Sequence, residues 1–217
     1  MAVEHLTPNQ IHEVLNQIAN AIICAEPELS EADRRLGDGD HGIGMKRGME
    51  AALEQLRKSE EDAPLPEQFS TVGMAMMSSM GGASGVVFGS LFSAGKKALK
   101  EAPQELTPSA IADWLEGAAA TVMKRGGAKP GDKTMLDALV PAAEKARECE
   151  NDSCVLEALE KVAVAAETGR DDSEKLIATM GRAKTLGEKS IGHPDAGACS
   201  VAVILRTMAD TAKKLAQ

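Results

Sequence analysis

The sequence of 217 residues predicts an all-α protein, an antiparallel up-and-down bundle of about eight helices. Three observations favour this class. Apolar residues recur at helical spacing along most of the chain, and no stretch alternates apolar and polar residues as a half-buried strand would. Aromatic residues make up only 2% of the chain, and tyrosine is absent. Alanine, leucine and methionine must therefore fill the core, which favours closely packed helices.

The first half of the chain contains several helix signals. Thr7 to Gln10 combine an N-cap threonine, a proline at the first helical position and a capping-box glutamine. This start predicts a helix that ends near Cys24. A second helix is expected to begin near His41, because apolar side chains follow it on one face. A charged linker with prolines covers 59–67, and an apolar helical segment follows at about 70–80.

The second half repeats these signals. Helices are expected at 86–99, from Pro108 onward behind a second threonine–proline start, and at 135–147, 155–166 and 198–215. The stretch 167–189 is polar and interrupted by glycines, which is more typical of a lid or mobile loop than of core. No internal repeat or break in composition divides the chain, so a single domain over 1–217 is expected.

Charge and hydropathy narrow the range of partners. The net charge of −9 and the pI near 5.0 argue against nucleic acid or an anionic membrane as the main partner. The N-terminus lacks the basic region and apolar stretch of a signal peptide, and no run of 18 apolar residues that would indicate a membrane span occurs.

Cys149 and Cys154 are a weak zinc candidate, because no second pair lies near them. Reduced thiols in a cytoplasmic protein are the better interpretation.

The most informative segment is 33–44, where Asp33, Asp38, Asp40 and His41 occur among glycines. Concentrated negative charge is unfavourable unless a cation neutralises it, and carboxylate oxygens are the ligands that hard cations such as Mg²⁺ require. Glycines allow the backbone to fold around an ion. The segment is therefore predicted to be a metal loop. The competing interpretation is a solvated turn with helix-capping aspartates, which fits Asp33 alone better than the full set.

Two common motifs do not explain these residues. An EF-hand that starts at Asp38 would need an acidic or amide residue at its fifth position and a glutamate at its twelfth, where Gly42 and Met49 stand. A P-loop at 126–134 is interrupted by Asp132 and follows no strand. His41, beside two candidate ligands, is interpreted as a phosphate contact in preference to a capping histidine.

Four glycine-rich connections, at 37–44, 81–85, 126–132 and 192–197, open predicted helices. In an up-and-down bundle, alternate connections fall at the same end. Backbone N–H groups at a helix start, together with the helix dipole, favour an anion. We therefore expect these connections to gather at one rim and to bind a polyphosphate together with the metal.

Four motifs occur in an order that resembles a known family. They are Gly-Asp-Gly-Asp-His-Gly at 37–42, Ser-Ser-Met-Gly-Gly-Ala-Ser-Gly at 78–85, Lys-Pro-Gly-Asp-Lys-Thr-Met at 129–135, and Gly-Arg-Ala at 181–183 followed by Gly-Glu-Lys-Ser-Ile-Gly-His at 187–193. From about residue 8 to 215 the chain is similar to the L subunit, the nucleotide-binding subunit, of dihydroxyacetone kinase. The resemblance implies an eight-helix antiparallel barrel with its nucleotide at one rim.

The resemblance also implies roles for individual residues. Two Mg²⁺ ions would be bound by Asp33, Asp38 and Asp40, which with Arg182 form the expected catalytic set. The cofactor, ADP or ATP, would contact the helix starts and the lid through His41, Gly42, Ile43, Gly44, Ala83, Ser84, Gly126, Met135, Arg182, Asp195, Ala196 and Gly197. Family members often carry asparagine or threonine at the position of Gly44, so one side-chain contact to phosphate is absent here.

The family's reaction implies the expected partners. An L subunit acts with a separate K subunit that holds dihydroxyacetone, and its bound ADP is rephosphorylated by a phosphohistidine carrier protein of the phosphotransferase system. Alternatives stay open: ATP as an exchanging substrate, another ketose such as erythrulose, or a nucleotide-sensing module on a transcription regulator. The sequence does not settle the ketose, the phosphoryl donor, any regulatory partner or the oligomeric state, for which a homodimer is one option.

Overall fold

The computed structural model describes residues 3–99 and 105–217, and the chain there is helical. These residues form nine α-helices and two 3₁₀ helices: α1 Pro8–Cys24, α2 Glu26–Leu36, α3 His41–Leu56, α4 Leu65–Ser79, α5 Gly82–Ala98, α6 Pro108–Gly126, α7 Leu136–Glu148, α8 Val155–Asp172, η1 Ser173–Lys175, η2 Arg182–Ser190 and α9 Ala196–Leu215. A single antiparallel bridge joins Leu6 to Leu106. Within the described ranges, no helix has the length and apolar character needed to cross a membrane.

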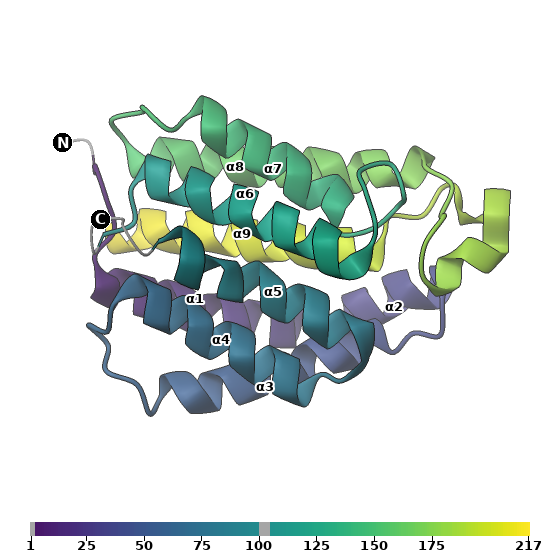
Figure 1. Ribbon diagram of the computed structural model, residues 1–217, viewed down its shortest axis with the longest axis horizontal. Coiled ribbons are helices and arrows are strands. Elements are labelled where there is room, and N and C mark those ends of the chain that lie inside the picture. Colours follow the sequence, from purple (N-terminus) through teal and green to yellow (C-terminus); the bar gives the residue numbers. More distant parts are fainter. Residues whose placement is uncertain (1–2, 100–104) are drawn as a thin grey trace.

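Eight of the α-helices form a closed ring, which confirms the predicted all-α class. Each helix from α3 to α8 packs against the next, α9 packs against α8, and α1 closes the ring between α9 and α3. Consecutive ring helices run in opposite directions (Figure 1). The remaining helix, α2, packs against α3 and α9 at one end of the ring.

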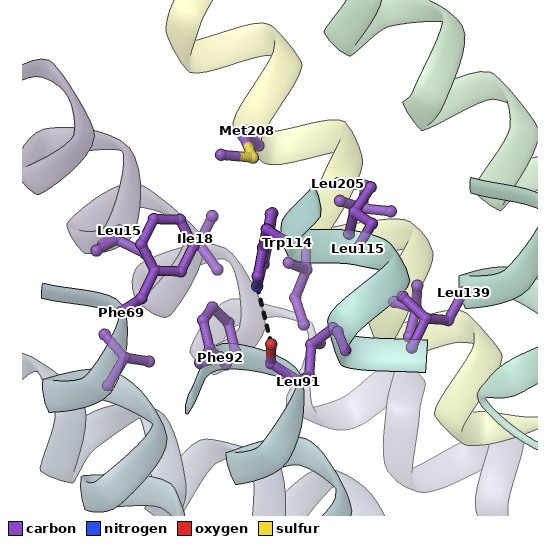
Figure 2. Packing of buried hydrophobic residues seen from close by; sticks show 14 of the residues in the cluster. Leu15, Ile18, Phe69, Leu91, Phe92, Trp114, Leu115, Leu139, Leu205 and Met208 are labelled. Carbon is purple, nitrogen blue, oxygen red and sulfur yellow. Dashed lines mark hydrogen bonds between the residues drawn. The ribbon is translucent and has the colours of Figure 1, made fainter. Parts of the chain in front are cut away.

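The interior of the ring is filled by aliphatic side chains around one aromatic cluster. Trp114 is fully buried, and its ring lies 4.7 Å from that of Phe69 in an edge-on arrangement. The indole Nε1–H donates to the carbonyl of Leu91 at 2.9 Å, so the buried donor is satisfied (Figure 2). This cluster ties α4, α5 and α6 together at the centre of the molecule.

The predicted helix starts are confirmed where capping signals are strong. Thr7 and Gln10 form the expected reciprocal box: the Thr7 N–H donates to Gln10 Oε1 at 2.9 Å, and the Gln10 N–H donates to Thr7 Oγ1 at 3.4 Å. Thr107 caps α6 by accepting from the N–H of Ala110 at 3.2 Å. These local bonds explain why both helices begin where the sequence indicates.

Two segments differ most from the sequence prediction, while α4 also begins early, at Leu65 inside the predicted linker 59–67. Helix α2 was not expected, because only Leu29, Ser30 and Leu36 of its eleven residues are buried and no apolar stripe reveals it. Asp33 therefore lies on a helix, and the loop itself is only 37–40. The irregular stretch is also shorter than the lid predicted at 167–189, because α8 continues to Asp172 and two short 3₁₀ helices order part of the remainder.

The alternation of helices places four starts at one end of the ring. Helices α3, α5, α7 and α9 all begin at the end that carries α2 and the yellow-green 3₁₀ segment, on the right in Figure 1. The C-terminus lies at the opposite end. The expected gathering of the four glycine-rich connections at one rim is thus confirmed.

Candidate functional site

Three carboxylates converge at this rim. Asp33 extends from the last turn of α2, and Asp38 and Asp40 come from the loop before α3; each offers an oxygen, and these oxygens lie within 4.8 Å of one another. Asp33 Oδ2 accepts from the N–H of His41 at 3.2 Å, which fixes α2 against the start of α3. The set provides only hard oxygen donors at close spacing. Its chemistry and geometry fit Mg²⁺.

Arg182 lies over this carboxylate cluster. Its guanidinium forms an ion pair with Asp38 and lies 3.7 Å from Asp40 Oδ2. The three side chains are exposed, with Arg182 66% and Asp40 70% accessible, so the pairs are screened by water and contribute little to folding. Arg182, which the resemblance places in the catalytic set, thus lies beside the carboxylates, and its catalytic role stays a prediction.

A cavity of about 700 Å³ opens beside the carboxylates. This volume is typical of a small-molecule pocket. The starts of α3, α5, α7 and α9 all contribute to its wall. Each start leaves N–H groups without helical acceptors and carries the positive end of a helix dipole. Four such ends around one cavity favour a polyanion, while the carboxylates attract the cations that accompany it.

The cavity wall contains the predicted cofactor residues, except Gly42. Ala83 and Ser84 are exposed in the first turn of α5, behind Gly81 and Gly82, whose positive φ values of +73° and +62° turn the chain sharply into the helix. Gly42 is buried instead against Glu26 and Ser30 of α2. Its structural role is to let α2 and α3 approach closely. The nucleotide contacts themselves stay predictions.

His41 is held on the inner side of the cavity. Its Nε2 lies 2.8 Å from Ser200 Oγ on α9, and its ring lies 5.5 Å from that of Phe88. Burial lowers the pKa of His41, and the nearby Asp33 only partly opposes this, so the neutral imidazole is favoured at neutral pH. His41 thus connects α3 to α9. The phosphate contact of His41 stays a prediction, and it would have to come from the side chain, because the backbone N–H already donates to Asp33.

Asp195 caps α9 at the cavity wall. Its Oδ2 accepts from the N–H of Ala198 at 2.8 Å. Burial raises the pKa of this carboxyl to about 7, while the hydrogen bond from Ala198 and the positive charge of Lys133 oppose the rise. Folding raises the pKa of this carboxyl from 3.8 to about 7, so the protonated form is favoured in the folded state. The group therefore contributes its full stability to the fold only below about pH 4. This stability is lost as pH rises towards 7.

We therefore expect Asp195→Asn to stabilise the protein selectively at high pH. The asparagine oxygen can still cap α9, but it never carries charge. The advantage of the variant over the parent in free energy of unfolding should grow by about 2.5 kcal/mol between pH 5 and pH 8, because the parent loses up to about 1.4 kcal/mol per pH unit in the window where only its unfolded state is ionised. Urea unfolding at both pH values measures the difference. Parallel pH profiles would contradict the assignment of this carboxyl.

The sequence does not reveal three residues near this site: Lys133 in the connection before α7, Asp137 in the first turn of α7 and Arg47 on α3. Asp137 accepts from the N–H groups of Gly131 at 2.5 Å and Thr134 at 2.7 Å, which shapes the turn. Lys133 is buried and lines the cavity. Arg47 of α3 also lines the cavity and donates to the carbonyl of Met80. Lys133 stands in the motif at 129–135, but no sequence pattern reveals its burial.

Comparison with known proteins agrees with this geometry. The DAK2 domain model matches residues 35–210. The chain is 37% identical to the PEP-dependent dihydroxyacetone kinase ADP-binding subunit DhaL of Escherichia coli K12, over 96% of this chain and 99% of that one. It is also 38% identical to a D-erythrulose kinase of Mycolicibacterium smegmatis, over 92% of this chain but only 35% of the relative. These relatives are kinases or kinase subunits.

The fold matches a solved structure as well. The dihydroxyacetone kinase of C. freundii superposes with a TM-score of 0.72 at 23% identity, covering 97% of this chain and 36% of that protein. A second crystal structure of that enzyme, in complex with AMP-PNP and Mg²⁺, gives a TM-score of 0.71 at 24% identity. At this identity the match concerns the fold. By the domain model and by near full-length identity, this chain belongs to the DAK2 domain family of phosphotransferases, as a protein of the dihydroxyacetone kinase L-subunit type.

Proposed function

We propose that this chain is the nucleotide-binding subunit of a dihydroxyacetone kinase. The observation that carries the proposal is the cluster of Asp33, Asp38 and Asp40 beside a cavity walled by four helix starts. Cation ligands and anion-binding helix ends meet there, as a magnesium–nucleotide complex requires. The full-length relative from Escherichia coli is named an ADP-binding subunit, and the C. freundii enzyme was crystallised with AMP-PNP and Mg²⁺.

The residues would divide the work of phosphoryl transfer as follows. Asp33, Asp38 and Asp40 would hold two Mg²⁺ ions, which when bound neutralise charge on the phosphate oxygens. The N–H groups at the start of α5, near Ser84, lie at the cavity wall and would stabilise the same charge without reorganising. Arg182 would then contact the phosphate instead of the carboxylates. Positioning and charge neutralisation are the main requirements of this chemistry.

The reaction would need a second protein to hold the ketone. The chain spans 99% of the Escherichia coli subunit but only 35% of the erythrulose kinase, so the long relative has further domains. We infer that a separate K subunit carries dihydroxyacetone. The exposed Ile43, Ile177 and Ile191, on α3 and the lid segment, offer apolar surface at this end of the ring for such a partner. The proposed reaction involves neither a nucleic acid nor a membrane as a partner.

The phosphoryl source would be a phosphohistidine protein of the phosphotransferase system, acting on retained ADP. Relatives named PEP-dependent or PTS-dependent, at 37% identity in Escherichia coli and 40% in Lactococcus lactis, support this route. The second candidate is a kinase subunit that exchanges ATP freely and acts on dihydroxyacetone or erythrulose. Identities of 37% and 38% to erythrulose kinases, over 32% and 35% of the length of those relatives, support erythrulose as a substrate of that candidate.

One experiment separates the two routes. The purified chain is mixed with a K subunit, dihydroxyacetone, Mg²⁺ and ATP, without the carrier protein, and dihydroxyacetone phosphate is measured over time. The relay predicts at most one product per chain, because the ADP formed stays bound. It also predicts that ADP co-elutes with the chain in gel filtration. Many turnovers limited only by the ATP supply would establish the exchanging kinase instead.

A further inference from the structure

Lys133 is placed at considerable conformational and electrostatic cost. Its side chain is only 2% exposed, and its φ of +59° makes it the one residue other than glycine with a positive φ among residues 3–99 and 105–217. A buried ammonium is unfavourable unless it is paired, and a left-handed backbone is strained for a long side chain. Strain of this kind persists where the surrounding structure requires it, often next to functional sites.

The hydrogen bonds of the Lys133 side chain reach η1 and the residue after it, directly beyond the end of α8. Its Nζ donates to the carbonyl of Ser173 at 2.6 Å and to that of Leu176 at 3.2 Å. Ser173 is fully buried, and its Oγ donates to the Arg170 carbonyl at 2.5 Å and accepts from the N–H of Asp195 at 3.0 Å. Lys133 therefore joins the connection before α7 to the end of α8, and through Ser173 to the start of α9.

The same contacts anchor the lid, defined here as residues 176–192. The lid leaves η1 at Leu176, whose carbonyl Lys133 binds, and returns at Gly192, whose N–H donates to the Glu174 carbonyl at 2.8 Å. A third attachment joins Thr179 Oγ1 to Asp132 Oδ1 at 2.6 Å, one residue before Lys133. The first end of the lid and its first turn are thus fixed to the segment that contains Lys133, and its return end is fixed to η1. Arg182, which pairs with Asp38, lies within the lid.

We propose that Lys133 is a positioning residue: through Ser173 and Leu176 it fixes the lid that holds Arg182 against the phosphate side of the cavity. The proposal deepens the proposed function, since it rests on a nucleotide occupying that cavity. The lid geometry itself does not depend on the ligand. If Lys133 merely filled space in the core, it would stabilise the whole helical ring. Its replacement would then not make the lid more mobile.

The test uses the full chain with three substitutions. Lys133→Met keeps the length and the backbone strain but removes the donor; Lys133→Arg restores a cationic donor; and Lys129→Met makes the same chemical change on an exposed residue of the same connection. Hydrogen exchange followed by mass spectrometry is measured without nucleotide. In Lys133→Met, peptides covering 176–192 should exchange about tenfold faster or more, while peptides from α1 and α6 stay unchanged. Lys133→Arg should recover most of the protection, and Lys129→Met should match the parent.

A second readout follows the nucleotide. The dissociation rate of fluorescent ADP in the presence of Mg²⁺ should rise about tenfold in Lys133→Met and much less in Lys133→Arg, because a loose lid mainly speeds release. Unchanged lid exchange in a folded Lys133→Met chain would overturn the inference. If the parent itself does not bind ADP, the proposed function fails, whereas the exchange data still decide the role of Lys133.

A substitution in the lid itself tests the anchoring even if Lys133→Met fails to fold. Thr179→Val removes the hydroxyl that reaches Asp132 from an exposed position, so the ring should fold normally. If Lys133→Met does not fold, faster exchange confined to 176–192 in Thr179→Val supports lid anchoring by this segment. Exchange equal to that of the parent overturns it.

Discussion

Replacing Asp38 with asparagine should abolish the Mg²⁺-dependent retention of nucleotide. Asp38 is one of the three carboxylates of the cluster, and the amide keeps its shape while removing the charge and one good ligand oxygen. We expect the affinity for Mg²⁺–ADP to fall by at least about a hundredfold, since even substitution of residues that only support metal ligands costs ten- to a hundredfold. Titration calorimetry with and without Mg²⁺ measures the loss.

Two comparisons make this result specific. Asp62→Asn makes the same change on an exposed residue of the connection between α3 and α4, at the opposite end of the ring, and should bind like the parent. Without Mg²⁺, the free energy of unfolding of the Asp38→Asn protein should stay within about 1 kcal/mol of the parent, because an exposed ion pair with Arg182 contributes little. ADP occupancy unchanged after gel filtration would refute the metal assignment.

Replacing Gly42 with alanine should damage the site indirectly, through the packing of α2. A methyl group at this position would overlap the carbonyl of Glu26 and approach the Ser30 nitrogen to 2.6 Å, and both are backbone atoms of α2 that cannot rotate away. We expect a loss of about 3 kcal/mol in the free energy of unfolding, as in severe overpacking. Because α2 carries Asp33, the affinity for Mg²⁺ should fall as well. Chemical denaturation and Mg²⁺ titration measure the two effects.

Gly44→Ala is the matched control, one half-turn further along the same helix. Its new methyl group would meet only the flexible end of Met80 at 4.0 Å, and alanine is a better helix former than glycine. We expect the unfolding free energy to rise by about 0.5 kcal/mol. If both alanine variants were equally stable, the close approach of α2 and α3 would not depend on Gly42.

The fold could be predicted because its signals are local. The threonine caps at Thr7 and Thr107 form between residues three apart, and the apolar stripes of α3 and α6 repeat every turn, so both can be found without knowing the neighbours. Helix α2 could not be found in this way, because it is polar and its place depends on packing against α3 and α9.

The candidate site, too, could be predicted only where its signal lies within a few neighbouring residues. The spacing of Asp38, Asp40 and His41 within one loop indicated a metal site, since charge crowded into a few residues has chemical meaning wherever the loop lies. The roles of Gly42 and Lys133 depend on contacts with Glu26 and Ser173, which are distant in sequence or belong to other elements. No periodicity records those contacts.

The sequence by itself determined the helical class, most helix boundaries and the acidic loop, because each depends on interactions within a few residues. Only the tertiary structure decided that Asp33 reaches the cluster from a separate helix, that four helix starts surround one cavity, and that Lys133 lies buried beneath the lid. These features arise from closure of the ring, which joins α1 to α9 and brings together residues more than a hundred positions apart. Such contacts depend on the path of the whole chain.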